Sequence, residues 1–273
     1  MSSGRPQPGS RSDGPRRFGR RWLALKLLRI VRAGAGRRAV PLGIVRAVRR
    51  VGSGTNPLTP PAHGRSAKRL RTRPLATLLK GTELGRWSPG PRSIDELVEM
   101  VRELRPETVL ELGSGTTTIV LAWAVRDALG PGARPRIVSV EQDPEHAAAT
   151  TERLVAAGLD QGVTVITARL VDQEVEGRRT SCYALPGDLA EALEGRLADL
   201  VFIDGPAGPP GIRFGTLPLV QPFVRVGATF VLDDALRDGE LEVARQWAAL
   251  PYASVLGVRL IEHGLLIGRV GTA

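Results

Sequence analysis

Short apolar runs alternate with amphipathic stretches from about Leu75 to the C-terminus. Most of these runs are rich in Val, Ile and Leu and lack the alternation of a half-exposed strand, which is typical of parallel strands covered on both faces by helices. The runs are Thr108–Leu112, Ile137–Glu141, Val163–Ile166, Leu200–Asp204 and Ala228–Asp233, with helical stretches between them. The pattern predicts an α/β domain built on a doubly wound sheet.

The C-terminal end departs from this rhythm. Ala253–Ile261 and Leu265–Val270 are separated only by a tight turn at Glu262–Gly264, so we expect an antiparallel hairpin at the edge of the sheet. The sheet would then hold about seven strands. Before the first run, an amphipathic helix is predicted over Ile94–Leu104, with Ser93 and Glu96 as a capping box at its start.

Charge divides the chain into two parts. Residues 1–75 carry 19 Lys and Arg against one acid, whereas residues 76–273 carry 19 basic and 27 acidic residues. We predict a basic arm over 1–75 and a folded domain over 76–273. The arm is expected to be largely disordered, with short amphipathic helices near Arg21–Val31 and Val40–Val51. Such helices can lie on an anionic membrane surface, although a GC-rich genome also encodes Arg-rich stretches of this kind.

Composition limits the location and the partners of the protein. The acidic balance of the domain argues against nucleic acid as a partner. The single cysteine, Cys182, excludes an internal disulfide. The apolar run Trp22–Val31 is interrupted by Lys26 and Arg29 and is too short to span a bilayer. We expect a cytoplasmic protein, with peripheral association of the arm at the membrane as an open alternative.

The segment 109–118, VLELGSGTTT, predicts a strand, a glycine turn and the start of a helix. Gly113 and Gly115 let the backbone approach a ligand closely. The third glycine of a dinucleotide fingerprint would fall at Thr118, and no P-loop lysine follows, so pyrophosphate is poorly provided for. Glu111 would repel phosphate but could attract the ammonium group of a methionine moiety, directly or through water. These residues favour S-adenosylmethionine over a dinucleotide.

The second run ends at Glu141, and an acid at this place can accept hydrogen bonds from both hydroxyls of a ribose. Together, the segments ELGSGTTT, VSVEQD, DLVFIDGP and FVLDDA resemble the motifs of class I S-adenosylmethionine-dependent methyltransferases. The resemblance covers roughly residues 80–270 and leaves the arm outside. It implies a Rossmann-like fold and S-adenosyl-L-methionine as the cofactor.

The resemblance also implies a set of cofactor-binding residues. The glycine turn with its preceding glutamate would hold the methionine part, the end of the second strand the ribose, and the end of the third strand the adenine. The residues are Glu111, Gly113, Ser114, Gly115, Glu141, Gln142, Ala168, Arg169 and Asp204.

Acidic residues end the fourth and fifth runs, where the ligand crevice of an open α/β sheet lies. We expect the carboxylates of Asp204, Asp233 and Asp234 to converge there, and Mg²⁺ prefers oxygen ligands of this kind. The placement resembles the metal-dependent catechol and caffeoyl-CoA O-methyltransferases. It therefore implies a metal site at these three residues, where a bound ion would lower the pKa of an acceptor hydroxyl.

The catalytic base is left open by the sequence. The lysine that those enzymes carry three residues after the first metal aspartate is Ala207 here, so Asp204 or Asp233 would serve as base, with or without a metal. Arg213 could neutralise an anionic acceptor. The alternatives are structural: Asp204 would cap the following turn, and Asp233 or Asp234 would cap a helix starting near Ala235.

The leading hypothesis is a class I S-adenosylmethionine-dependent methyltransferase acting on a hydroxyl of a small molecule or a sugar. Oxygen is favoured over nitrogen because Asp204-Gly205-Pro206 stands where an Asn-Pro-Pro-Tyr-like motif would indicate an amine acceptor. Two alternatives stay open: a nicotinamide-dependent oxidoreductase on a similar fold, and a membrane- or nucleic-acid-associated adaptor that acts through the basic arm. The sequence identifies neither the acceptor nor the oligomeric state.

Overall fold

The computed structural model describes residues 39–51, 65–66, 69–85, 87–185, 187 and 189–272. The disorder predicted for the arm concerns residues that mostly lie outside these ranges, and so does the helix predicted near Arg21–Val31. The second predicted helix of the arm is present as α2 (Leu42–Val51). In the part of the chain that is described, no helix is long and apolar enough to cross a membrane.

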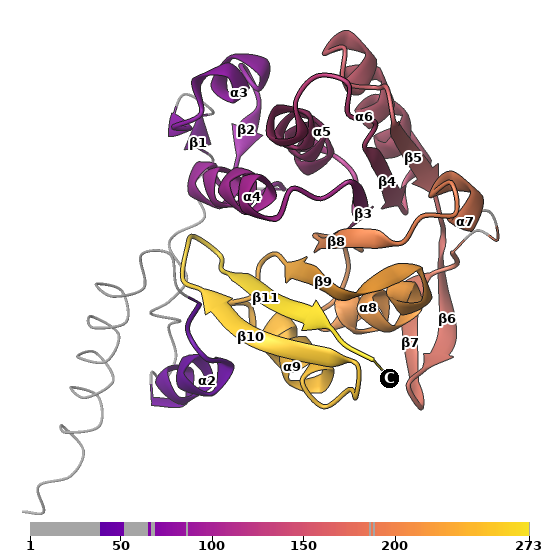
Figure 1. Ribbon diagram of the computed structural model, residues 1–273. Coiled ribbons are helices and arrows are strands. Elements are labelled where there is room, and N and C mark those ends of the chain that lie inside the picture. Colours follow the sequence, from indigo (N-terminus) through magenta and orange to yellow (C-terminus); the bar gives the residue numbers. More distant parts are fainter. Residues whose placement is uncertain are drawn as a thin grey trace, which may run out of the picture.

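The central sheet has seven strands. They are β3 (Thr108–Leu112), β4 (Arg136–Glu141), β5 (Val163–Thr167), β8 (Ala198–Ile203), β9 (Val224–Leu232), β10 (Ala253–Arg259) and β11 (Leu265–Val270). Their order across the sheet is β10-β11-β9-β8-β3-β4-β5 (Figure 1). The strands from β9 to β5 pair in parallel, whereas β11 is antiparallel to both β9 and β10. The predicted Rossmann-like sheet with its C-terminal hairpin is confirmed.

Helices cover both faces of this sheet (Figure 1). One face carries α4 (Pro91–Leu104), α5 (Thr116–Leu129) and α6 (Pro144–Ala156), with α3 (Arg73–Leu78) beside α4. The other face carries α2, α7 (Leu189–Ala192), α8 (Thr216–Val220) and α9 (Asp238–Trp247), together with the 3₁₀ turns η2 (Ile212–Gly215) and η3 (Gln221–Phe223).

Alternation along the strands splits the core into two. Leu110 and Leu112 of β3 belong to the cluster under α8 and α9, whereas Val109 belongs to the cluster under α4 and α5. Because successive side chains of a strand point to opposite faces, Glu111 shares the α5 face with Val109. The α9 side is fixed by Trp247, whose indole N–H donates to the Phe214 carbonyl at 2.8 Å.

The segment between β5 and β8 differs from the prediction of a helical stretch. It forms a separate antiparallel hairpin, β6 (Leu170–Val175) and β7 (Arg178–Tyr183), before the one-turn helix α7. The turn residues Glu176 and Gly177 both have positive φ, 51° and 68°, which is the backbone that a two-residue hairpin turn favours. The polar alternation of this hairpin follows from its place outside the main sheet.

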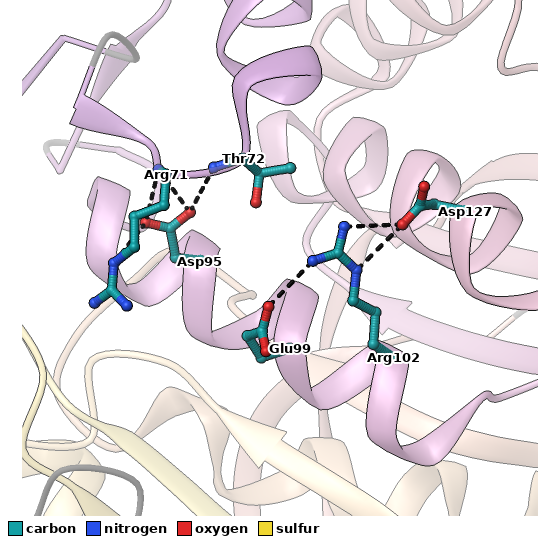
Figure 2. Close-up of polar contacts among 6 residues, drawn as sticks. All are labelled: Arg71, Thr72, Asp95, Glu99, Arg102 and Asp127. Carbon is teal, nitrogen blue, oxygen red and sulfur yellow. Dashed lines mark hydrogen bonds and ion pairs between the residues drawn. The ribbon is translucent and has the colours of Figure 1, made fainter.

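Residues on the arm side of position 75 also contribute to the domain. Val40 pairs with Val258 of β10, and Val40, Val45 and Leu70 are buried in the core. Asp95 of α4 accepts hydrogen bonds from the backbone N–H groups of Arg71 and Thr72 (Figure 2). A second small hairpin, β1 (Arg65–Ser66) with β2 (Glu83–Leu84), lies in the same region.

The start of α4 corrects the predicted capping box. The helix begins at Pro91, with Gly90 as N-cap, so Ser93 lies inside its first turn. The Ser93 N–H donates to the carboxylate of Glu262 at 3.0 Å, and a Cβ on Gly90 would overlap that carboxylate. A negative charge at a helix N-terminus is favourable, so the turn between β10 and β11 supplies the cap that the local sequence does not.

Candidate active site

The glycine turn after β3 is held by a buried hydrogen-bond chain. The Gly115 N–H donates to Thr118 Oγ1 at 2.9 Å, and that hydroxyl donates to Glu111 Oε2 at 2.6 Å. Ser139 Oγ of β4 donates to the same Glu111 oxygen at 2.6 Å. Thr118, which stands in place of the third glycine of a dinucleotide turn, thus connects the turn to Glu111. Gly113 is required here because it has φ 96° and its Cβ would meet the Gly205 nitrogen at 2.6 Å.

Glu111 is fully buried, and its Oε1 has no hydrogen-bond partner among the described residues. Burial raises the pKa of its carboxyl from 4.5 to about 7, against the opposing effect of the Ser139 and Thr118 hydrogen bonds. The side chain lies behind the turn rather than in a cavity wall. Its position therefore indicates that Glu111 stabilises the glycine turn from behind.

Glu141, at the end of β4, faces the same turn from the other side. Its Oε2 accepts the N–H of Ser114 at 2.9 Å and the Ser114 hydroxyl at 3.2 Å. Its Oε1 accepts the N–H groups of Gln142 at 2.7 Å and Asp143 at 3.0 Å. These donors fix the carboxylate at the carboxyl edge of the sheet. Because the Ser114 hydroxyl can donate to Thr150 Oγ1 at 3.3 Å instead, a lone pair of Glu141 Oε2 remains for a ligand.

A cavity of about 400 Å³ opens between the ends of β3, β4 and β8. Its walls include five of the predicted cofactor-binding residues. These are Gly113, Ser114, Glu141, Gln142 and Asp204. The other four predicted residues, Glu111, Gly115, Ala168 and Arg169, do not line it. Ala168 is buried, and its N–H donates to the Glu141 carbonyl at 2.7 Å, so it extends the pairing of β4 with β5.

The remaining wall of this first cavity comes from residues that the sequence reasoning did not assign to it. Tyr183 brings a buried hydroxyl that has no hydrogen-bond partner among the described residues. The Nε2 atom of His146, on α6, lies 3.0 Å from the carbonyl oxygen of Ser114. The Ala207 N–H donates to Gln142 Oε1 at 3.0 Å and so ties the loop after β8 to the end of β4. A buried, unpaired hydroxyl beside a glycine turn is an arrangement that a polar ligand would complete.

The three predicted acceptor-side aspartates come together. Asp204, Asp233 and Asp234 each present one oxygen, and these three oxygens lie within 4.8 Å of one another. The caps predicted as the structural alternatives are not formed. The helix that Asp233 or Asp234 would cap begins only at Asp238, with Arg237 as N-cap, and the side chain of Asp204 faces Arg213.

Burial and mutual repulsion raise the pKa values of two of these carboxyls. The pKa of Asp204 rises to about 6, mainly through desolvation and against the attraction of Arg213. The pKa of Asp233 rises well above its usual value through desolvation and through the nearby charges of Asp234 and Asp204. Asp233 Oδ1 is buried and has no hydrogen-bond partner among the described residues.

A second cavity, of about 170 Å³, adjoins the first. Asp204, Ala207 and Trp87 belong to the walls of both. Trp87 is 87% exposed, an unusual state for a large aromatic side chain. The charged residues and the histidine of the second cavity come from η2, the turn after β9, the start of α9 and the turn between β10 and β11: Arg213, Asp233, Asp234, Arg237, Glu240 and His263. Of these, Arg237, Glu240 and His263 had no predicted role, because nothing in their local sequence shows that η2, α9 and the hairpin meet there.

The comparisons with known proteins agree with this architecture. Residues 110–235 match the family model described as a methyltransferase domain. A comparison with curated proteins gives no significant match.

Several solved structures share the fold. The O-methyltransferase from Bacillus cereus in complex with SAH is 18% identical, with 84% of this chain and 97% of that chain covered and a TM-score of 0.50. The cofactor-bound protein Rv0187 from MTB is 22% identical, with 74% and 89% covered and a TM-score of 0.51. The SAH-bound methyltransferase PaMTH1 of Podospora anserina is 17% identical, with 78% and 91% covered and a TM-score of 0.51.

At these identities the likeness to solved structures concerns the fold, and the family match concerns the segment from β3 to the end of β9. Together they confirm the resemblance to class I S-adenosylmethionine-dependent methyltransferases. Residues 110–235 match a methyltransferase domain, and the sheet order and the glycine turn agree with that match.

Proposed function

We propose that the protein transfers a methyl group from S-adenosyl-L-methionine to a hydroxyl group of a small molecule or a sugar. The observation that carries this proposal is the place of Asp204 in the walls of both cavities. The first cavity has the glycine turn and Glu141, whereas the second has the carboxylates and arginines. A methyl donor and a methyl acceptor that occupied the two cavities would therefore meet at Asp204.

The first cavity suits the cofactor by its chemistry. Glu141 Oε2 could accept a hydroxyl of a ribose when the Ser114 hydroxyl donates to Thr150. The unpaired Tyr183 hydroxyl and the Ser114 side chain could contact the methionine part. Glu111 would act indirectly, by holding the turn through Thr118. When bound, S-adenosyl-L-methionine supplies an electrophilic methyl group on a sulfonium.

Asp204 is our candidate for the general base. A carboxyl whose pKa is raised to about 6 is largely ionised at neutral pH but holds a proton better than an ordinary aspartate, which suits it to accept the proton of an acceptor hydroxyl. Asp233 is the weaker candidate of the two predicted bases, because it lines only the second cavity.

The proposal is tested by incubating the full chain with methyl-deuterated S-adenosylmethionine and a panel of hydroxylated metabolites. We expect a mass increase of one deuterated methyl group in at least one product, and a loss of this product with Asp204→Asn. Labelled amines that are methylated while no hydroxyl is would contradict the acceptor class. The oxidoreductase alternative is disfavoured by Thr118, whose buried side chain occupies the place of the third glycine.

The basic arm supports a separate proposal about location. Val40 and Val258 exchange two backbone hydrogen bonds of 2.8 Å, and Val258 continues in register through Leu266 and Leu232 to Ile203. Asp204 and Asp233 directly follow the last two of these residues. At about 4.8 Å per strand, Val40 lies roughly 15 to 20 Å from the acidic cluster.

We infer that the arm places the active-site edge of the domain near an anionic membrane surface. Residues 1–38 carry 11 Lys and Arg against one acid, and each basic residue near such a surface adds to the attraction. Flotation of the full chain with vesicles tests this. We expect binding to phosphatidylglycerol-containing vesicles at low salt, loss of binding at high salt, and none to phosphatidylcholine alone. Absence of binding to the anionic vesicles would contradict the inference.

A further inference from the structure

Arg213 lies at the centre of the acidic cluster. It comes from η2, and its side chain is only 7% exposed. Its Nη2 is 3.3 Å from Asp204 Oδ1, and its Nη1 is 3.6 Å from Asp234 Oδ2. The same Nη1 donates to the backbone carbonyl of Asp233 at 3.2 Å. One guanidinium therefore contacts all three residues whose carboxylates converge.

A second arginine completes the charge balance. Arg237 Nη1 lies 2.8 Å from Asp234 Oδ2, so two of the three carboxylates already face a cation: Asp204 faces Arg213, and Asp234 faces both arginines. Removing the partner of a buried, paired carboxylate is strongly destabilising. Arg213 thus supplies the compensation that a bound ion would otherwise have to supply.

A divalent cation fits this arrangement poorly. Mg²⁺ requires near-octahedral oxygen ligands at about 2.0 to 2.1 Å, whereas Asp204 and Asp234 each already direct one carboxylate oxygen at an arginine. An ion between the carboxylates would lie within a few ångströms of a buried guanidinium, where charge repulsion is only weakly screened. The metal site that the sequence resemblance implies therefore does not match the side chains that surround it.

We propose that Arg213 takes the place of a divalent cation in this cavity, so that the acidic cluster is held together, and an acceptor oxygen is bound, without a metal. A guanidinium carries five N–H donors, and two are used by Asp204 and the Asp233 carbonyl. A further donor can face an acceptor oxygen in the cavity that Arg213 lines. The unpaired, buried Oδ1 of Asp233 is the corresponding acceptor for a ligand hydroxyl. Only the contact with an acceptor rests on the proposed function; the replacement of the metal does not.

The direct test is calorimetric titration of the full chain with MnCl₂ and MgCl₂ at pH 7.5. We expect no saturable binding in the micromolar range for the wild-type protein. Saturable binding that Asp233→Asn abolishes would overturn the proposal. Binding that Asp233→Asn leaves unchanged would lie outside the cluster and would agree with it. Because no methyl transfer is measured, this result does not depend on whether the proposed activity is correct.

Substitution of Arg213 gives the converse result. Arg213→Met leaves the carboxylates without their cation, so we expect its affinity for Mn²⁺ to exceed that of the wild type by about tenfold or more, and its melting temperature to rise when Mg²⁺ is added. Arg245→Met is the matched control, because Arg245 pairs with Glu242 on the exposed side of α9, and it should behave like the wild type.

If Arg213→Met does not fold, Arg213→Lys keeps the charge and should remain indifferent to both ions. The proposal would be overturned if the wild type, Arg213→Lys and Arg213→Met bound Mn²⁺ with equal affinity and Asp233→Asn abolished the binding in each. Such a result would show that the arginine does not exclude a metal.

Discussion

Replacing Glu111 by Gln should change the pH dependence of stability in a defined direction. Gln keeps an oxygen that can accept the hydrogen bonds of Ser139 and Thr118, but it cannot ionise. In the folded protein the pKa of Glu111 is raised from 4.5 to about 7 by burial. The variant therefore isolates the free energy of placing this charge behind the glycine turn.

The sign follows from proton linkage. Below pH 4.5 the carboxyl is protonated in both states and carries no charge penalty. Between pH 4.5 and about 7 the unfolded chain loses a proton that the folded chain keeps, so wild-type stability falls as the pH rises. Above about pH 7 the full penalty is present. A pKa difference of about 2.5 corresponds to about 3 kcal/mol, most of which develops between pH 5 and pH 8.

Urea unfolding followed by tryptophan fluorescence at pH 5, 6, 7 and 8 measures this. Relative to the wild type, Glu111→Gln should gain about 2 to 3 kcal/mol in unfolding free energy from pH 5 to pH 8. The N–H groups of the new amide do not contribute to this gain, since any cost in folding free energy that they carry is the same at every pH. Glu152→Gln, at an exposed position of α6, controls for removal of a carboxyl. Parallel curves for the wild type and Glu111→Gln would refute the assigned burial of charge.

Three further changes test the site and its supports. Thr118→Val removes both the donor to Glu111 and the acceptor of the Gly115 N–H. Urea unfolding should therefore show a loss of about 1 to 3 kcal/mol in unfolding free energy, and an unchanged unfolding midpoint would contradict the role of the hydrogen-bond chain. Trp87→Ala should leave the melting temperature unchanged, because the side chain is 87% exposed. It should weaken S-adenosylhomocysteine binding several-fold in calorimetry, and an unaltered affinity would show that Trp87 does not contact the ligand. Gly268→Ala would place a Cβ against the buried ring of Phe230 and should cost about 1 to 3 kcal/mol, with Gly187→Ala, which meets no neighbouring atom, as the neutral control in the same unfolding assay.

The elements that the sequence predicts well are those whose burial is decided locally. β3 has the predicted bounds, because every residue of Thr108–Leu112 is buried. The residues directly before and after it in the sequence do not continue the apolar run. The hairpin β6–β7 was missed because it lies outside the main sheet, so its residues are largely polar and resemble a helix surface. The cap of α4 was misassigned because the group that fills it, Glu262, is far away in the chain.

The candidate site shows the same division. Glu141 ends a strand, Gly113 and Asp204 directly follow strands, and parallel topology brings strand ends to one edge, so their neighbourhood could be predicted. Arg213, Arg237 and Glu240 reach the cluster from η2 and α9, and only the packing of these elements shows that Asp204 and Asp234 are already paired. Burial of Glu111 behind the turn is likewise a property of the packed sheet, because it depends on Ser139 and Thr118 closing over it.

The cavity between β3, β4 and β8 is the expected binding site of S-adenosylmethionine. Calorimetric titration of the full chain with S-adenosylhomocysteine and with NADH tests it most directly, with Glu141→Gln alongside. We predict saturable binding of S-adenosylhomocysteine, at least about tenfold weaker in Glu141→Gln because a charged hydrogen-bond acceptor is lost, and no binding of NADH. Binding of NADH in preference to S-adenosylhomocysteine, or no binding of S-adenosylhomocysteine to the folded wild-type protein, would contradict the account.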